Sequence, residues 1–479
     1  MRKYDAVIIG SGPNGLAAGI EMGRQGLQVL ILEAQETIGG GMRSGSYTLP
    51  GFIHDHCSAV HPAGYLSPYF KTLPLTDFGL EWIHPEISVA HPLENEPAAM
   101  LYQSIEKTSA ELGLDDENWK NSFSYFVEHG ENLLRDGMGP LQFPKNPFLL
   151  ANFGIKGLQS AQNFVQKNLA TNRAKALFAG CAGHSILPLS QRLTAAVGMM
   201  FVIQGHLATW PVIKGGTENL AVALKNYFLK LGGEIQTSFR VENFGQLPEA
   251  SCYLFDTSPA QLINIAQDQL PNSYTKKLKN YRYGPGIFKL DWALSGSIPW
   301  KDPNCEKAST VHVGGTFAEI ARSEATVWKG QHADEPFLIL CQQSEIDRSR
   351  APRASHTGYA YCHVPQGSSL DQTAAIENQI ERFAPGFKDL ILARKSTNCK
   401  EFENDNPNYL GGAITGGVAD LKQFFFRPAI KLDPYSTPNK KIFICSAATP
   451  PGGGVHGMCG YYAARSALKK VFGKKASTI

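Results

Sequence analysis

The feature that most constrains this chain is a glycine-rich turn near its N-terminus. A buried apolar stretch, Tyr4 to Ile9, runs directly into Gly10-Ser-Gly12-Pro13-Asn14-Gly15, and a segment of helical character follows from Leu16 to Gln25. In such a strand–turn–helix unit the first glycine makes the tight turn, the second admits a pyrophosphate, and the third lets the helix pack on the strand. The helix N-terminus then faces the phosphates. The pattern predicts a dinucleotide-binding unit of the Rossmann type, with phosphate contacts at Gly10, Gly12, Pro13, Asn14 and Gly15.

An acidic residue follows at the spacing expected for ribose recognition. A second predicted strand, Gln28 to Leu32, ends in Glu33, eighteen residues after Gly15, and Ala34 comes next. A carboxylate at this place accepts the two ribose hydroxyls of an adenosine and disfavours a 2′-phosphate. Glu33 and Ala34 are therefore predicted to bind the adenosine half, which both FAD and NAD contain.

A second glycine cluster decides between these two cofactors. Gly39-Gly40-Gly41-Met42-Arg43 begins six residues after Glu33. NAD-binding domains do not require a glycine cluster followed by an arginine at this position. The sequence resembles the large family of FAD-dependent oxidases and desaturases, in which a Gly-Gly-Arg segment passes under the pyrophosphate with its guanidinium near the phosphates. The resemblance implies FAD contacts from Gly39, Gly40, Gly41, Met42 and Arg43; the alternative is a flexible turn with a solvated arginine.

The C-terminal region contains a matching half-site. A predicted strand, Ile442 to Cys445, is followed by Gly452-Gly453-Gly454-Val455-His456-Gly457 and by a helix from about Met458. Adjacent glycines allow the backbone to approach a planar ring, and the helix N-terminus stabilises negative charge on a reduced flavin. Gly453, Gly454, Val455 and His456 are thus predicted beside the flavin. His456 is the candidate catalytic residue, as a cation or proton shuttle, unless it only fixes the shape of the loop.

Longer stretches narrow the resemblance. The run TPPGGGVHGMCGYYAA, with His312-Val-Gly-Gly-Thr316 and Asn408-Tyr-Leu-Gly-Gly412, resembles the phytoene-dehydrogenase-like branch, and most of all the group named pyridine nucleotide-disulphide oxidoreductase domain-containing protein 2. The resemblance implies that the backbone of Val241 contacts adenine. Disulphide reduction is not expected, because none of the nine cysteines is spaced as C-x-x-C.

These motifs predict an α/β fold with a discontinuous, doubly wound Rossmann-type FAD domain and a mixed α+β substrate domain. The FAD domain is assigned to residues 1–75, 205–280 and 430–479, and the substrate domain to 76–204 and 281–429. The predicted strands Phe337 to Gln342 and Gly358 to Val364 indicate a sheet that faces the flavin. The apolar segment Phe148 to Phe201 fits an ordinary helical core better than a substrate tunnel or a membrane-resting surface.

Composition excludes some partners and locations. A formal net charge of +3 gives no sign of nucleic-acid binding. The scattered cysteines and the absence of a signal-peptide pattern favour a cytoplasmic protein. A metal site is not expected at His54-Asp55-His56, because the sequence signals no fourth ligand. The basic residues Lys469, Lys470, Lys474 and Lys475 leave peripheral contact with an anionic membrane open as an alternative to a solvated tail.

The leading functional hypothesis is an FAD-dependent oxidoreductase that removes hydride from a small apolar substrate, isoprenoid or polyene, as a desaturase or isomerase. Oxygen or a quinone is the expected electron acceptor. One alternative is a flavin amine oxidase, in which Lys214 would be the lysine that holds a water near the flavin. A second is an FAD-bound protein that acts through partner contact without turnover. The substrate identity and the oligomeric state are not encoded in any motif.

Overall fold

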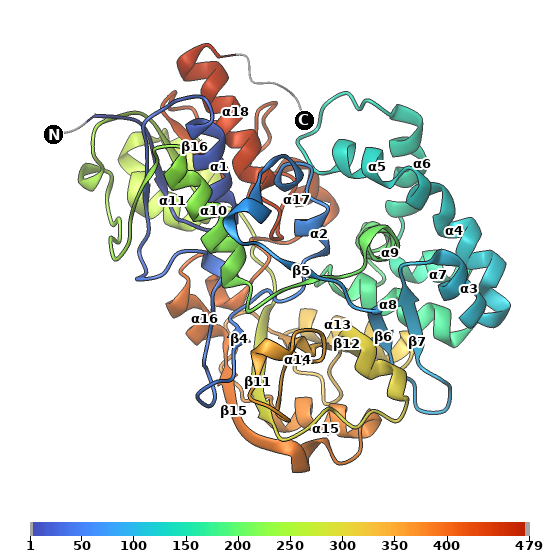
Figure 1. Ribbon diagram of the computed structural model, residues 1–479. Helices are drawn as coiled ribbons and strands as arrows, with labels where there is room; N and C mark the ends of the chain where they lie inside the picture. Colours follow the sequence, from blue (N-terminus) through green and yellow to red (C-terminus); the bar gives the residue numbers. More distant parts are fainter. Residues whose placement is uncertain (1–2, 475–479) are drawn as a thin grey trace.

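A parallel sheet forms the centre of one half of the molecule. The computed structural model describes residues 3–474, so the predicted tail residue Lys475 lies outside the described residues. The sheet has five strands, all parallel to their neighbours. In spatial order they are β16 (Ile442–Ile444), β10 (Ala250–Phe255), β1 (Tyr4–Ile9), β2 (Val29–Leu32) and β9 (Glu234–Gln236). This confirms the predicted Rossmann-type sheet (Figure 1).

Both faces of the parallel sheet are buried, as a parallel sheet requires. Ala6 and Ile8 of β1 point into one apolar core, and the alternating Val7 and Ile9 point into another. The first core is covered by α1 (Pro13–Gly23), α10 (Glu218–Lys230) and α18 (Met458–Phe472), and the second by α11 (Pro259–Ala266) and α12 (Asn272–Lys279). Helices α1 and α18 approach so closely that a Cβ on Gly460 would lie 1.9 Å from the Asn14 carbonyl oxygen. Only glycine fits there.

A mixed sheet of seven strands forms the other half. Its order is β15 (Ile391–Thr397), β11 (Gly286–Leu294), β14 (His356–Val364), β13 (Leu338–Cys341), β12 (Ala308–Val313), β6 (Ile87–His91) and β7 (Ala99–Tyr102). The neighbours β12 and β6 run parallel, and the other pairs are antiparallel. Two short ribbons pair β3 (Ser44–Gly45) with β4 (His54–Asp55), and β5 (Trp82–Ile83) with β8 (Val212–Ile213).

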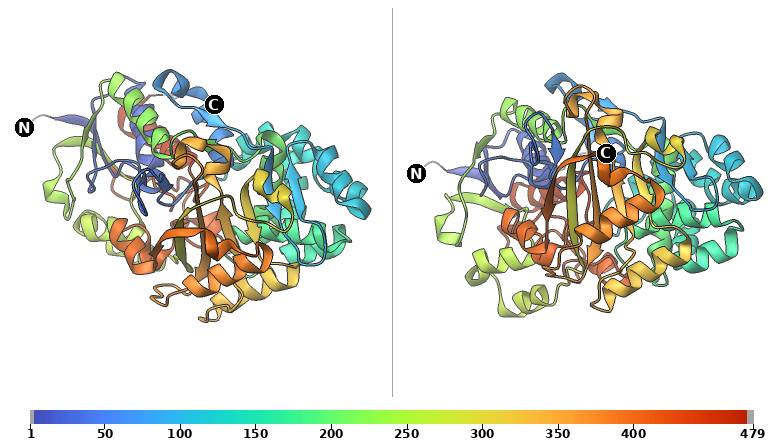
Figure 2. Two further views of the ribbon diagram at one scale, coloured as in Figure 1. Left: turned by 60° about the horizontal axis from the view of Figure 1, so that its bottom comes forward. Right: turned by 90° about the horizontal axis from the view of Figure 1, so that it is seen from below.

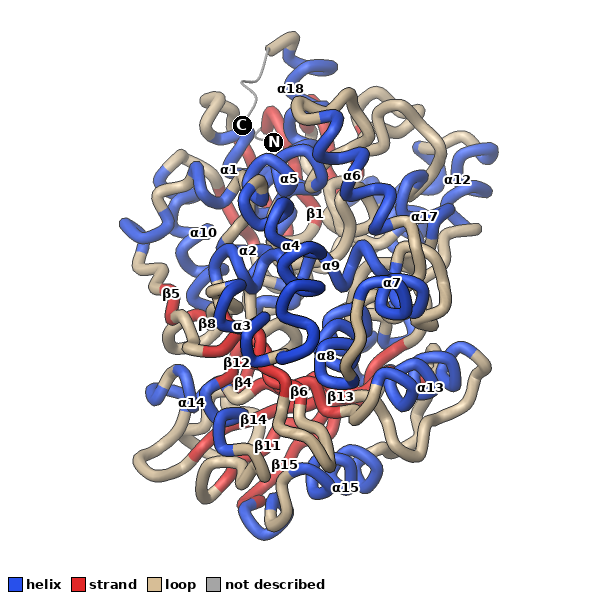
Figure 3. Tube along the Cα trace, turned by 90° about the vertical axis from the view of Figure 1, so that its right-hand side faces the viewer, coloured by secondary structure: helices blue, strands red, loops and turns tan. Residues whose placement is uncertain are grey.

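Helices cover the mixed sheet on both faces (Figures 2 and 3). One apolar core lies between the sheet and a helical group, and another lies between the opposite face and α15 (Thr373–Phe383). The helical group comprises α3 (Ile105–Glu111), α4 (Asp116–Glu128), α6 (Pro147–Gly157), α7 (Ala161–Asn168), α8 (Asn172–Gly183), α9 (Thr194–Ala208) and α13 (Phe317–Trp328). The remaining helices are α2 (Pro62–Tyr65), α5 (Gly130–Gly137), α14 (Gln343–Ile346), α16 (Cys399–Asp405) and α17 (Leu421–Phe426).

The strands of the two sheets come from different segments of the chain. All strands of the parallel sheet fall in residues 1–75, 205–280 and 430–479, and all strands of the mixed sheet fall in 76–204 and 281–429. The exact domain boundaries stay a prediction. Among residues 3–474, no helix is long and apolar enough to cross a membrane.

Candidate functional site

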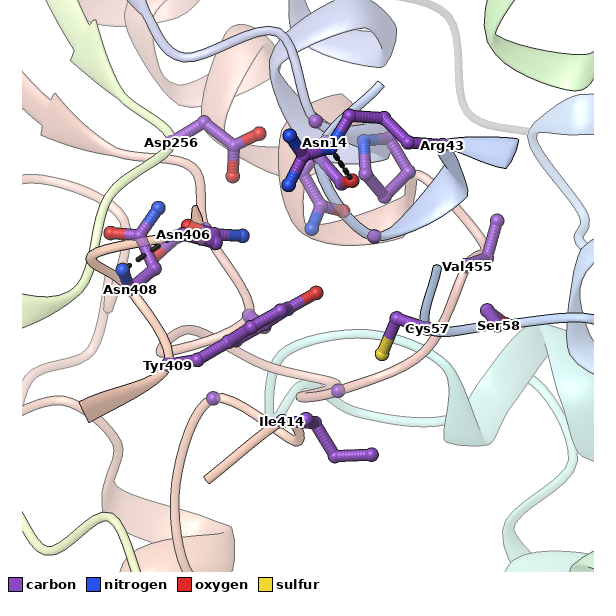
Figure 4. Close-up of a pocket in the computed structure, with 18 of the residues that line it drawn as sticks. Asn14, Arg43, Cys57, Ser58, Asp256, Asn406, Asn408, Tyr409, Ile414 and Val455 are labelled. Carbon is purple, nitrogen blue, oxygen red and sulfur yellow. Dashed lines mark hydrogen bonds between the residues drawn. The ribbon is translucent and has the colours of Figure 1, made fainter. Parts of the chain in front are cut away.

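A cavity of about 390 Å³ joins the carboxyl ends of the parallel strands to one face of the mixed sheet. Most of the residues predicted to bind the cofactor line it (Figure 4). They are Gly10, Gly12, Pro13, Asn14, Glu33, Ala34, Gly40, Gly41, Arg43, Val241, Gly453, Gly454 and Val455. The structure thus brings segments more than 400 residues apart into one wall.

The N-terminal glycines leave room for a ligand because they carry no side chains. Gly12 is the residue before α1, and a Cβ on it would lie 2.7 Å from the Asp256 Oδ2 atom. A Cβ on Gly40 would lie 3.3 Å from the Gly12 Cα atom. The Asn14 side chain is 3% exposed, and its Oδ1 atom has no hydrogen-bond partner among the described residues. A bare backbone at a helix N-terminus fits a pyrophosphate, whereas the Asn14 Oδ1 atom, as an acceptor, would need a donor other than a phosphate oxygen.

Glu33 is held in a fixed orientation at the end of β2. Its Oε2 atom accepts hydrogen bonds from the Ser11 backbone N–H (3.0 Å) and from the Ser11 hydroxyl (2.6 Å). Its Oε1 atom accepts one from the Gln35 N–H at 2.9 Å. A carboxylate has about four lone-pair sites, so these three bonds leave about one, on Oε1, for a ribose hydroxyl. Val241, which is buried, lines the same end of the cavity.

Arg43 is oriented by backbone carbonyl groups. Its Nε–H donates to the Gly40 oxygen at 3.0 Å, and an Nη2–H donates to the Asp405 oxygen at 3.2 Å. No carboxylate neutralises it in these contacts, so the guanidinium keeps its charge for an anion in the cavity. By contrast, Gly15, Gly39 and Met42 do not line the cavity. Met42 is fully buried in the core, and the Gly39 N–H donates to the Ser11 oxygen. Both contacts hold the second glycine cluster in place.

The C-terminal glycine loop lies against a segment that precedes α17. A Cβ on Gly453 would be 2.4 Å from the Thr415 oxygen, and Gly454 has a φ of 130°. Neither position accommodates another residue without rearrangement. The loop also leads into α18, whose N-terminus begins at Met458.

His456 is buried within this loop and does not line the cavity. Its Nδ1 atom accepts the Met458 N–H at 3.1 Å, and its carbonyl oxygen accepts the Ser67 hydroxyl at 2.7 Å. Burial lowers the pKa of His456 to about 4. These contacts favour the loop-shaping role over that of a cation beside the flavin.

Sequence reasoning gave no site role to Asp256 or to the segment around Tyr409. Asp256 directly follows β10, the strand beside β1, and its Oδ2 atom accepts the Gly15 N–H at 2.8 Å. The rule that ligands bind at the carboxyl ends of parallel strands would have identified it. Tyr409 and Ile414 face the cavity from the opposite wall (Figure 4). The Asn408-Tyr-Leu-Gly-Gly412 motif was visible in the sequence, but nothing in it indicated which side chain faces a ligand.

Burial controls the charge of Asp256. It raises the pKa of this carboxyl to about 7; the Glu33 carboxylate adds to the rise, and the hydrogen bonds from the backbone of Gly15 and Gly12 oppose it. The thiols that face Asp256 from β16 and α18 are those of Cys445 and Cys459, and burial raises the pKa of both. Around neutral pH, Glu33 is therefore the charged neighbour of Asp256 among these groups.

A buried ionic network centred on Arg350 lies outside the cavity lining. The Arg350 guanidinium donates to Asp55 Oδ2 (3.0 Å), to Asp347 Oδ2 (3.1 Å) and to the Ile213 oxygen (3.1 Å). Burial favours the neutral form of Asp55, but Arg350 and hydrogen bonds from Thr217 and Ser44 hold the pKa of this carboxyl below its usual value. Asp55 thus takes part in an ion pair in the part of the chain that the structure describes. Lys214 forms an exposed ion pair with Glu81 at 2.9 Å, away from the cavity lining.

The end of the cavity at the mixed sheet is mainly apolar and aromatic. The predicted strands Phe337 to Gln342 and Gly358 to Val364 correspond to the neighbours β13 and β14, and both contribute to the lining. The lining residues here are Val60, His61, His184, Phe201, Trp210, Thr310, Ile339, Cys341, Tyr359 and Tyr361. None of these side chains is a carboxylate; the lining acids Glu33, Asp256 and Asp405 belong to the dinucleotide end.

Comparison with known proteins supports the same interpretation of the site. Residues 8–73 match the NAD(P)-binding Rossmann-like domain family. Pyridine nucleotide-disulfide oxidoreductase domain-containing protein 2 from Rattus norvegicus is 23% identical over 96% of this chain and 93% of its own length. A lycopene-forming phytoene desaturase from Pantoea ananas is 23% identical over 96% of this chain and 98% of its own.

The solved structure of wild-type putrescine oxidase bound to putrescine has the same fold. It gives a TM-score of 0.63 at 14% identity and covers 98% of this chain and 99% of its own. The strand–glycine–helix unit, the two-ended cavity and the full-length similarity to these oxidoreductases lead to one conclusion. The chain is similar over nearly its full length to oxidoreductases of the FAD type, and its residues 8–73 match an NAD(P)-binding Rossmann-like domain.

Proposed function

We propose that the protein removes hydride from an apolar substrate of the isoprenoid or polyene class, as a desaturase or isomerase does. The observation that carries this proposal is the apolar, aromatic end of the cavity, which is continuous with the dinucleotide end. A pocket without a carboxylate side chain offers little to a cationic substrate and suits an uncharged one. The similarity to phytoene desaturases over nearly the full chain supports the same substrate class.

The residues described above would hold FAD. Gly12, Asn14 and Arg43 would bind the pyrophosphate, Glu33 the ribose, Val241 the adenine, and Gly453 to Val455 the flavin ring. The flavin supplies a hydride acceptor at N5. The protein's own contribution is to position a substrate carbon at the junction of the two ends and to exclude water with Phe201, Trp210 and Tyr359. His456 would fix the shape of the glycine loop.

Amine oxidation is the second candidate, and the fold shared with putrescine oxidase favours it. An amine substrate would have to enter this cavity as a neutral base, because no carboxylate is present at the apolar end of the described lining to pair with an ammonium group.

Anaerobic titration of the purified flavoprotein separates the candidates. Bleaching of the flavin by a polyene or isoprenoid, and not by aliphatic amines, is the expected result. Bleaching by amines alone would replace the proposal with amine oxidation. Bleaching by neither class would leave the third hypothesis, a flavin-bound protein that acts through partner contact.

Nicotinamide cofactors should not reduce the flavin at a useful rate, because the single dinucleotide fingerprint is used for FAD. Electrons would then leave to oxygen or to a quinone. Rapid anaerobic bleaching by NADH or NADPH would require a second nucleotide site.

Contact with a membrane surface is compatible with the structure as a route for apolar substrates. Phe143, which precedes α6, is 89% exposed. Phe148 and Ile155, both on α6, are 87% and 74% exposed. The predicted basic tail supports it less, since Lys470 pairs with Asp433 at 2.6 Å and Lys474 donates to the Gln25 oxygen. Flotation with anionic vesicles would test it.

A further inference from the structure

Two histidines are in contact at the apolar end of the cavity. His184 follows the last turn of α8 and lines the cavity, while His312 belongs to β12 and is fully buried. Their Nε2 atoms are 2.9 Å apart, so one of the two rings donates a hydrogen bond to the other. The His184 ring also lies against Phe201, with ring centroids 4.3 Å apart, and meets the edge of Trp210 at 5.5 Å. Its position at the cavity wall is therefore fixed by packing.

Both imidazoles are neutral at physiological pH. Burial lowers the pKa of His184 to about 3, and burial lowers the pKa of His312 well below its usual value. Each ring then carries one proton, on either Nδ1 or Nε2. The hydrogen bond between the two Nε2 atoms uses one of these protons. The surroundings of the two Nδ1 atoms determine which histidine donates it.

The buried Nδ1 atom of His312 decides the tautomer. This atom has no hydrogen-bond partner among the described residues, and it packs against Gly180, where a Cβ would come within 2.4 Å of it. A buried N–H without an acceptor is costlier than an unused nitrogen lone pair. His312 therefore has its proton on Nε2 and donates it to His184. His184 accepts at Nε2 and must carry its own proton on Nδ1.

The Nδ1–H of His184 is left without a protein acceptor. No hydrogen bond from this atom exists within the described residues, and it is not enclosed by protein atoms, since the residue lines the cavity. The surrounding wall of Phe201, Trp210 and Ile339 offers no acceptor side chain. The structure thus directs one fixed donor into an apolar compartment.

We propose that His184 is a specificity-determining residue that donates a hydrogen bond from Nδ1 to an oxygen of the substrate. The substrate class is an apolar, isoprenoid-like molecule that carries a carbonyl or hydroxyl oxygen, rather than a pure hydrocarbon. His312 is the positioning residue that sets the tautomer. This inference rests on the proposed function for the hydrophobic part of the substrate, but not on the occurrence of hydride transfer.

The test compares two probes that differ in one functional group. Farnesylacetone, an isoprenoid ketone, is titrated into the FAD-loaded protein beside the hydrocarbon in which CH₂ replaces its C=O. Binding is followed by perturbation of the visible flavin spectrum, which needs no turnover. The wild type should bind the ketone about tenfold or more tightly than the hydrocarbon, the scale of one hydrogen bond in a dry site.

Variants assign the preference to its donor. His184→Phe keeps the ring packing and should abolish the ketone preference while leaving hydrocarbon affinity unchanged. His312→Phe should reduce the preference, and His312→Gln, which retains an N–H donor, should restore part of it. The matched control His129→Phe changes a histidine that packs edge to face against Tyr125 away from the cavity lining, and it should behave as the wild type.

Three outcomes would overturn the proposal. They are equal affinity of the wild type for both probes, failure of either probe to bind, and a preference that survives in His184→Phe. In the last case, loss of the preference in Tyr361→Phe would assign it to the hydroxyl of Tyr361, which lines the same end of the cavity. A ketone preference that depends on His184 without bleaching of the flavin by any probe would support this inference and defeat hydride transfer. Bleaching by the hydrocarbon without a ketone preference would do the reverse.

Discussion

At the scale of single residues, the cofactor site combines a positive end and a negative one. Arg43 and the N-terminus of α1 face the predicted pyrophosphate, but the Asp256 carboxyl accepts the N–H of Gly15 in the same loop. A carboxylate at Asp256 would repel a pyrophosphate bound in the same loop, whereas a neutral carboxyl can donate a hydrogen bond to a phosphate oxygen. The protonation state of Asp256 therefore bears on FAD affinity.

FAD affinity should fall as the pH rises through about 7, the pKa to which burial raises Asp256. FAD binds the neutral form better, so affinity is greatest below this pKa and declines by up to about tenfold per pH unit above it. Asp256→Asn should remove most of this decline and bind FAD more tightly at pH 8. Fluorescence titration of the apoprotein from pH 6 to 9 measures it, with Asp268→Asn, at an exposed acid away from the cavity lining, as control. A wild-type affinity that does not vary with pH would contradict the prediction.

Glu33→Ala should weaken FAD binding by about 1.5–3 kcal/mol, the scale of a hydrogen bond to a charged group. The variant loses the ribose acceptor and also releases Ser11, which Glu33 holds at 2.6 Å. Glu33→Gln keeps one oxygen acceptor and should lose less. Equilibrium dialysis gives the affinities, and Glu36→Ala, an exposed acid three residues on, should match the wild type. Retention of full affinity by Glu33→Ala would remove this residue from the site.

The sequence predicted the residues of the glycine loops better than those of the opposite wall. Gly12, Glu33 and Gly453 could be identified because their chemistry depends on local spacing between a strand and a helix. Asp256 and Tyr409 face the cavity only through the packing of the whole fold, and His184 meets His312 across 128 positions of the chain. Contacts of that kind have no local signature.

At the scale of secondary-structure elements, a buried arginine connects short elements that have little packing of their own. Arg350, in the loop after α14, bonds Asp55 in β4 and the carbonyl group of Ile213 in β8. Each of these strands has only two residues. Their geometry depends on this ion pair more than on strand pairing.

Arg350→Met should destabilise the fold by about 3–5 kcal/mol, because it leaves the carboxylates of Asp55 and Asp347 buried without their cation. Chemical denaturation at pH 7 measures the change. Because the pairing lowers the pKa of Asp55, its contribution is present at neutral pH and is lost as the pH falls through the folded-state value. The stability difference between the wild type and Arg350→Met should therefore shrink in acid.

Arg322→Met is the matched control for this prediction. It breaks an exposed ion pair with Glu335, in which both side chains are more than half exposed. Such pairs contribute about 0–1 kcal/mol. A loss from Arg350→Met no larger than this control would show that the buried network is not structural.

The elements themselves were largely predictable, although their limits were not. The strands β1, β2 and β16 lie where the apolar runs placed them, since a parallel sheet buried on both faces needs continuous apolar sequence. The short strands β4 and β8 carry no such run. Within the segment Phe148 to Phe201 the expected core is present at Phe164, yet Phe148 is exposed, because helical periodicity does not reveal which face a neighbour covers.

At the scale of the whole molecule, the cofactor would link parts of the chain that are far apart in the sequence. The cavity wall combines the loop after β1, the residues after β10, the segment 405–416 and the glycine loop before α18. A ligand that binds only the folded state stabilises it by mass action.

Addition of FAD to the apoprotein should raise the unfolding temperature in proportion to the logarithm of its concentration. At a hundredfold excess over Kd the gain is about 2.7 kcal/mol. Differential scanning calorimetry measures the shift, and Gly12→Val, which fills the space beside Asp256, should show none. A shift of the wild-type size in Gly12→Val would place FAD elsewhere.

The strand order has a consequence for folding of the protein during its synthesis on the ribosome. The edge strand β16 pairs with β10, and the loop that follows β16 completes the cavity, although β1 is made more than 400 residues earlier. At translation rates of about 5–20 residues per second, roughly 20 to 90 s separate the emergence of the two glycine loops. Until then β10 has an open edge and the nascent pocket lacks one wall. Cofactor loading should therefore wait for the second glycine loop, and nascent chains stalled before β16 should not retain FAD.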